Sequence, residues 1–205
     1  MTLLEHFPRT LTVAFVLILA AAGTAFSQAA STLEAQRQQA DPATRFEQFS
    51  SKKGRLLVKT SYPGGEVRNS QGSVRVRGVS IGAPGEQERV YAVVFETEGR
   101  GAYPRSSSAV LDFDEAVSLL QAVERMMKMA GEMASSPSQP YTEILFETRS
   151  SFQAGFYQSE GKQTSFVKLE RFGNDGIRFG DLKMLEDLRA SVTGVVDQLR
   201  TVGAR

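Results

Sequence analysis

The feature that most constrains the fold of this chain is a pattern that occurs twice, with the two copies 66 positions apart. The first copy spans residues 110–127, VLDFDEAVSLLQAVERMM, and the second spans residues 176–192, GIRFGDLKMLEDLRASV. In each copy an aliphatic residue, one spacer and a phenylalanine precede an acidic residue and a helical run of apolar side chains. At a shift of 66 the apolar positions of both runs stay in phase. The pattern predicts a short strand leading directly into an amphipathic helix, used twice.

The first of these helices has a clear start signal. Asp112 and Glu115 stand at the spacing of a capping box, in which an acidic or hydroxyl side chain and a glutamate satisfy the first free N–H groups. The apolar stripe then predicts a helix over residues 113–133. In the second copy Arg178 takes the place of Asp112, so this cap is not repeated.

Segments with the composition of strands precede each helix and are separated by Gly, Pro and Asn turn residues. They cover residues 55–63, 73–81, 89–97 and 106–113 in the first half, and 141–150, 151–159, 164–172 and 177–179 in the second. Within the second segment the apolar positions change phase at Gly78, which predicts a β-bulge there.

This order predicts an α+β protein built from two β-β-β-β-α units by internal duplication, with antiparallel strands and helices packed on one face. Both one continuous sheet and two separate sheets satisfy the pattern. The order resembles the duplicated sheet–helix folds of the PUR and Whirly nucleic-acid-binding families, from about Arg55 to the C-terminus. The resemblance is one of architecture: neither family's motif is present, so no binding residues are carried over.

The first 27 residues have the pattern of a secretory signal. Residues 11–22 are apolar apart from Thr12, a run shorter than the roughly 20 residues of a membrane span. Arg9 precedes the run, and the small residues Ala25 and Ser27 follow at the −3 and −1 positions of a predicted cleavage site. We therefore expect a secreted or periplasmic protein without a membrane span after cleavage. The alternative is a signal retained as an N-terminal anchor.

Composition predicts how the rest of the chain is organised. Residues 28–51 are rich in Gln, Ala and Ser, which is typical of a flexible tether or a frayed helix. The first β-rich unit with its helix is expected over residues 52–133, a linker over 134–140, and the second unit over 141–205.

The residue types exclude most common catalytic chemistry. The chain has no cysteine, and its one histidine, His6, lies within the predicted signal. Nucleophilic triads, cysteine nucleophiles and zinc sites require these side chains. We therefore predict no catalytic residue, metal or cofactor, and a non-enzymatic binding or interaction module. The alternative is a hydrolase of envelope or extracellular polysaccharide that uses carboxylates alone, which needs two acids about 5–10 Å apart in a cleft.

The charge distribution indicates a candidate binding surface. Residues 52–105 carry 10 Lys/Arg and 5 Asp/Glu, whereas residues 106–205 carry 11 and 14. Arg75 and Arg77 share one face of a predicted strand, and Arg100 and Arg105 flank a loop that contains Tyr103. These residues are predicted to bind an anionic ligand or an acidic partner. The alternative interpretation is a solvated strand face whose charges prevent sheet association.

A second candidate is Tyr157, which alternation places on the face opposite to Phe156. Phe156 is expected in the core, and Tyr157 on an exposed face where an aromatic ring can stack on a ligand. The predicted partner is an unknown protein or an anionic ligand in the cell envelope. No nucleic-acid partner is expected, because an exported protein does not meet the genome.

Overall fold

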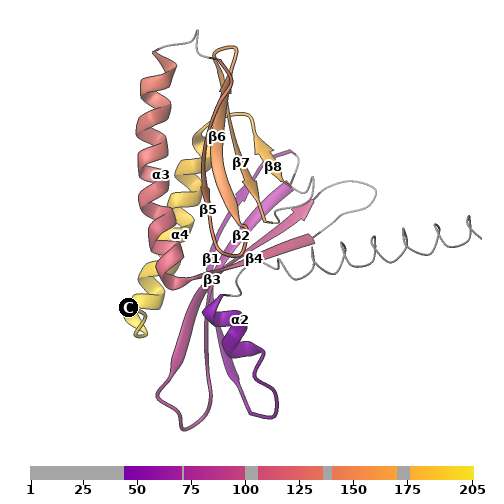
Figure 1. Cartoon of the computed structure of the whole chain (residues 1–205), viewed down its shortest axis with the longest axis vertical. Coiled ribbons are helices and arrows are strands. Elements are labelled where there is room, and N and C mark those ends of the chain that lie inside the picture. Colours follow the sequence, from indigo (N-terminus) through magenta and orange to yellow (C-terminus); the bar gives the residue numbers. More distant parts are fainter. Residues whose placement is uncertain (1–43, 71, 100–105, 136–139, 170–175) are drawn as a thin grey trace, which may run out of the picture. The chain divides into compact units, whose positions relative to one another are not determined.

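The computed structural model describes residues 44–70, 72–99, 106–135, 140–169 and 176–205 (Figure 1). All of them belong to one structural unit, Asp41–Arg205. They form two four-stranded antiparallel sheets, and each sheet is followed by a helix. The predicted α+β class with two similar units is therefore confirmed, with two sheets rather than one.

The first sheet, called sheet A, consists of β1 (Val58–Arg68), β2 (Gly72–Gly82), β3 (Arg89–Gly99) and β4 (Ser106–Asp112), and α3 (Phe113–Ala134) follows it. The second, called sheet B, consists of β5 (Thr142–Glu147), β6 (Gln153–Ser159), β7 (Lys162–Lys168) and β8 (Ile177–Phe179), and α4 (Lys183–Thr201) follows it. In both sheets each strand pairs with the next strand in the sequence.

The helix α3 begins where the capping pattern predicts. Asp112 is its N-cap, and the Asp112 N–H donates to Glu115 Oε2 over 3.2 Å. The buried side chains of α3 that recur every three or four residues are Ala116, Leu119, Val123, Met126 and Ala130. Because this spacing matches the helical period, one face of α3 is buried and the opposite face is left to solvent.

Both helices contact strands of both sheets, and α4 lies mainly on the sheet of the other unit. The helix α4 of the second unit packs on β1 and β2 of sheet A. Glycines make this close approach possible: a Cβ atom at Gly64 would lie 2.5 Å from a methyl carbon of Val195, and one at Gly65 would lie 2.2 Å from Ser191 Oγ. A larger residue at either position would push α4 away from the sheet.

The helix α3 in turn reaches sheet B. Gln163 Nε2 on β7 donates to the carbonyl oxygen of Ala130 over 2.8 Å. Phe95 of sheet A and Phe152, which precedes β6, stack with ring centroids 4.4 Å apart. One hydrophobic core therefore contains residues of both sheets and of both helices.

The bulge predicted at Gly78 is absent. The strand β2 pairs with β3 without interruption along its whole length. Val76 and Val79, on the two sides of this glycine, are both buried because they lie on opposite faces and each face is covered. Sheet A does contain a register shift, but it lies in β1 between Pro63 and Glu66.

A short helix, α2 (Arg45–Ser50), stands where the composition predicted a flexible tether over residues 28–51. Thr44 is its N-cap: the Thr44 N–H donates to Glu47 Oε2 over 2.8 Å, and the Glu47 N–H donates to Thr44 Oγ1 over 3.1 Å. This reciprocal capping box stabilises the first turn. Of the two alternatives that composition left open, a tether or a frayed helix, the helix is the one found over residues 45–50, and residues 28–43 lie outside the described residues.

The helix α2 covers part of the outer face of sheet A, meaning the face turned away from α4. Its two phenylalanines, Phe46 and Phe49, are buried. The buried strand residues packed with them are Val79, Ile81, Ala92 and Val94. The apolar side chains on both faces of sheet A therefore bury against α4 on one side and α2 on the other.

Candidate binding surface on sheet B

The predicted basic face of sheet A is largely neutralised. Arg75 and Arg77 share the outer face, as predicted, but glutamates of the neighbouring strands stand among them. Arg77 Nη2 lies 2.7 Å from Glu96 Oε1, and this contact lowers the pKa of the Glu96 carboxyl. Arg75 is paired in register with Glu66 on β1 and Glu96 on β3. These arginines therefore stabilise pairing within the sheet more than they attract an external anion.

Arg100, Tyr103 and Arg105 lie outside the described residues. Their prediction as a ligand-binding group stays a prediction.

Tyr157 lies on the outer face of sheet B, meaning the face turned away from the core. As alternation predicted, Phe156 is fully buried and Tyr157 is half-buried. Its ring centroid lies 5.6 Å from that of Tyr141 and 6.5 Å from that of Phe166. We call these three residues the aromatic row.

The members of the aromatic row differ in exposure. Tyr141 is 60% exposed, whereas Phe166 is 3% exposed and forms the base of the row. Leu145 on β5 adds a further exposed apolar side chain to the same face. Rings that are held by strand backbone lose little freedom when they contact a ligand, which suits them to binding.

Charged groups of both signs surround the aromatic row. Lys168 Nζ lies 5.1 Å from the centroid of the Phe166 ring, and the exposed Arg178 pairs in register with Phe166. The Tyr141 hydroxyl donates to Glu143 Oε2 over 2.9 Å, which raises the pKa of Tyr141. The surface therefore offers ring faces, hydroxyl groups and two cations to a ligand.

Sequence reasoning found Tyr157 but missed Tyr141 and Phe166. Tyr157 and Phe166 have the parity of the outer face within β6 and β7, and Tyr141 continues this parity just before β5. Their proximity depends on the strand register, in which Tyr157 stands opposite Glu143 on one side and Thr164 on the other. Alternation within one strand gives the face of a residue but not its neighbours across the sheet.

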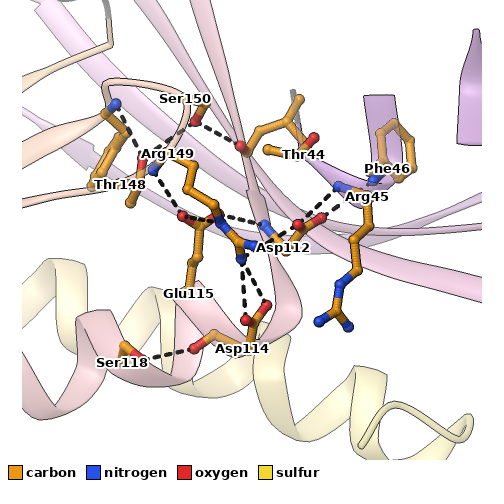
Figure 2. Close-up of polar contacts among 12 residues, drawn as sticks. Thr44, Arg45, Phe46, Asp112, Asp114, Glu115, Ser118, Thr148, Arg149 and Ser150 are labelled. Atoms are coloured by element: carbon orange, nitrogen blue, oxygen red, sulfur yellow. Dashed lines mark hydrogen bonds and ion pairs between the residues drawn. The ribbon is translucent and has the colours of Figure 1, made fainter. Parts of the chain in front are cut away.

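Acidic residues at the start of α3 form a separate cluster, which Figure 2 shows. Asp112 is buried, and its carboxylate accepts the Arg45 N–H over 2.9 Å and the Phe46 N–H over 3.2 Å. The same side chain that begins α3 therefore also holds the first turn of α2. Sequence reasoning predicted the first role and missed the second, because the two segments are more than 60 residues apart.

Arg149, in the turn between β5 and β6, completes this cluster (Figure 2). Its N–H and its Nε donate to Glu115 Oε1 over 2.8 Å and 3.1 Å, and its Nη2 lies 3.1 Å from Asp114. The Glu115 carboxylate raises the pKa of the Arg149 guanidinium. Because these carboxylates accept backbone N–H groups or pair with Arg149, the cluster joins α2, α3 and the β5–β6 turn.

A shallow groove lies between α3 and β5, and we call it the α3–β5 groove. Its volume is about 360 Å³. The residues that line it are Ser118, Gln121, Ala122, Arg125, Met126, Met129, Ile144 and Phe146. The lining contains no carboxylate, so this groove lacks the acid pair of a glycoside hydrolase.

Two further observations apply to the part of the chain that the structure describes. No cluster of His, Cys, Asp or Glu side chains is arranged to hold a metal ion. None of the helices there is both long enough and apolar enough to cross a membrane. In comparisons with known proteins, the chain matches no family model and no curated protein sequence.

Proposed function

We propose that this protein is an exported, non-enzymatic binding module that holds an anionic polysaccharide on the outer face of sheet B. The observation that carries the proposal is the aromatic row, with Lys168 and Arg178 beside it. Tyrosine rings stack on the apolar faces of sugar rings, and the two cations pair with carboxylate or sulfate groups.

The outer face of sheet B carries few cations for the binding of a nucleic acid. Glu143 and Glu147 are exposed on the same face as Tyr157, and the whole chain has a net charge of +1. A nucleic acid carries one negative charge for each nucleotide and binds through many cations. A polysaccharide can bind through contacts of its sugar rings with Tyr141 and Tyr157 together with two ion pairs, which suits a face on which carboxylates accompany the tyrosines.

The proposed location outside the cytoplasm rests on the sequence. The apolar run over residues 11–22 and the small residues Ala25 and Ser27 have the pattern of a secretory signal. An export assay with the first 40 residues fused to a reporter enzyme tests this part independently of binding. Retention of the reporter in the cytoplasm would contradict it.

The binding proposal is tested by calorimetric titration of the full chain with polygalacturonate. Neutral dextran and single-stranded oligothymidylate serve as comparison ligands. We expect Tyr157→Ala to weaken polygalacturonate binding about tenfold, which corresponds to about 1.4 kcal/mol. The matched control is Leu56→Ala, which truncates an exposed apolar side chain elsewhere, at 73% exposure.

Two results would overturn this proposal. One is oligothymidylate binding that is tighter than polygalacturonate binding and is equally sensitive to Tyr157→Ala. The other is polygalacturonate binding that both variants leave unchanged. Far-ultraviolet circular dichroism of each variant verifies that the fold is retained.

A further inference from the structure

The strand β5 is an edge of sheet B, and no other strand of the described residues pairs with its outer side. In an edge strand, every second residue directs its N–H and C=O groups away from the sheet. The corresponding edge of sheet A, β1, contains Lys59, Pro63 and a register shift, which are devices that discourage pairing. The opposite edge of sheet B, β8, has three residues. The six residues of β5 contain no Pro, Lys or register shift.

The inner face of β5 is incompletely covered. Ile144 and Phe146 are half-buried, whereas their register partners on β6, Phe156 and Ala154, are fully buried. The α3–β5 groove occupies the space above them, and the exposed Met129 lies on its α3 side. The layer between α3 and sheet B therefore lacks one row of apolar side chains along this edge.

The outer face of β5 is acidic. Glu143 and Glu147 are exposed, and the strand itself carries no cation. Residues directly opposite each other on paired strands have Cβ atoms about 4.5–5.5 Å apart, so charges on an added strand would interact with these glutamates. Opposite charges stabilise such pairs and like charges destabilise them.

We propose that β5 and the α3–β5 groove bind an extended peptide segment of a partner protein, which adds to sheet B as a fifth strand. The segment alternates apolar residues with lysine or arginine. Its apolar side chains enter the groove beside Met126 and Met129, and its cations lie opposite Glu143 and Glu147. The backbone of β5 supplies the hydrogen bonds.

Two other occupants fit this edge less well. A small ligand in an open groove keeps much of its surface in water, whereas small-molecule sites bury most of the ligand. A second copy of the chain would place acidic strands together: the antiparallel register that pairs Ile144 with Phe146 also sets Glu143 opposite Glu147. The charge of β5 therefore favours a basic strand.

The test uses a fluorescein-labelled octapeptide in which valine and lysine alternate, with binding to the full chain followed by fluorescence anisotropy. One comparison peptide has glutamate in place of lysine, one groups its valines and lysines in two blocks, and one is N-methylated at alternate amides. We expect the alternating basic peptide to bind about tenfold more tightly than any of the others.

Charge reversal on the protein sharpens the test. The double variant Glu143→Lys/Glu147→Lys should reverse the preference, so that the acidic peptide binds more tightly than the basic one. The matched control Glu88→Lys/Glu160→Lys makes the same change of net charge at exposed positions off β5 and should preserve the original order. Met129→Glu should weaken the binding of both alternating peptides, the basic one and the acidic one.

Three outcomes would overturn the proposal. One is equal binding of the N-methylated and unmodified basic peptides, and another is an unchanged peptide preference in Glu143→Lys/Glu147→Lys. The third is sedimentation of the wild-type chain as a dimer that Met129→Glu dissociates, which would assign the edge to a second copy. Polygalacturonate binding by Met129→Glu, whose substitution lies on α3, reports separately on the outer face of sheet B.

Discussion

The outer faces of the two sheets are built from similar strands but differ in how far other parts of the chain cover them. On sheet A, α2 buries one part of the outer face, and Glu66 and Glu96 balance the arginines on the other part. On sheet B no helix of the described residues docks on the outer face, and Tyr141 and Leu145 are exposed there. The first face is largely covered or charge-paired, whereas the second keeps exposed apolar side chains within the described residues.

This difference shows that the local density of positive charge in the sequence does not give the charge available on a surface. The basic half of the chain contributes arginines that pair across strands of sheet A. The acidic half contributes the face on which aromatic rings and cations remain available. Net charge by segment describes composition, whereas available charge depends on cross-strand partners.

The largest expected effect on the free energy of unfolding comes from truncating a side chain of α2 that covers sheet A. Phe49→Ala should lower the free energy of unfolding by about 3–4 kcal/mol, because this buried ring holds α2 on the sheet. Leu145→Ala, which truncates an exposed side chain on sheet B, should cost less than about 1 kcal/mol. Urea unfolding followed by circular dichroism measures both. Equal losses of unfolding free energy in the two variants would contradict the view that the outer face of sheet A contributes more to stability than that of sheet B.

The next effect concerns the carboxylate that joins α2 to α3. Asp112→Ala should cost about 2–3 kcal/mol, because it leaves one buried and one partly buried N–H group of α2 without their acceptor. Asp114 also pairs with Arg149 but is exposed, so Asp114→Ala should cost less than about 1 kcal/mol. Urea unfolding again measures the difference. A cost of Asp112→Ala no larger than that of Asp114→Ala would show that the cluster does not anchor α2.

A smaller effect compares matched pairs of cations on the two faces. Lys168→Ala/Arg178→Ala should weaken polygalacturonate binding about fivefold, because these cations stand beside the aromatic row. Arg75→Ala/Arg77→Ala removes the same charge from sheet A and should change the affinity less than about twofold. Calorimetric titration measures both variants. A larger loss of affinity in Arg75→Ala/Arg77→Ala than in Lys168→Ala/Arg178→Ala would instead favour a binding site on the outer face of sheet A.

The smallest effect is the coupling between Arg77 and Glu96. A double-mutant cycle with Arg77→Gln and Glu96→Gln should give about 0.5 kcal/mol at pH 7, because the pair is partly exposed. The Arg77 contact lowers the folded-state pKa of Glu96 below its ordinary value of 4.5. The coupling is therefore present above that value and decreases as the pH falls through the folded-state pKa. Urea unfolding of the four proteins at pH 7 and pH 3 measures it, and a coupling that is unchanged at pH 3 would contradict this assignment.

Periodicity predicted most of the elements, because a strand or helix that buries one face repeats its apolar residues at the matching interval. The start of α3 at Asp112 followed from the same local rules. The change of phase at Gly78 indicated a bulge only if one face of the strand is buried, whereas sheet A is covered on both faces by helices from distant parts of the chain. Over residues 45–50 the composition did not distinguish a tether from a helix, and contacts with sheet A stabilise the helix.

The candidate site was predicted in part. The exposed face of Tyr157 followed from alternation with the buried Phe156, but its ring neighbours depended on the register of β5, β6 and β7. Arg75 and Arg77 were placed on the correct face, and their glutamate partners were not foreseen. A contact between strands is set by turn geometry and by the packing of the whole sheet, and neither follows from the residues of one strand.

The sequence by itself determined the duplicated β-β-β-β-α order, the amphipathic faces of α3 and α4, and the scarcity of catalytic side chains, since each of these depends on residues that are close together or on composition alone. The tertiary structure decided which helix covers which sheet, which arginines are neutralised, and that Tyr141, Tyr157 and Phe166 form one row. The physical reason is that exposure and charge pairing are properties of neighbours in space, and here those neighbours come from different strands and from both halves of the chain.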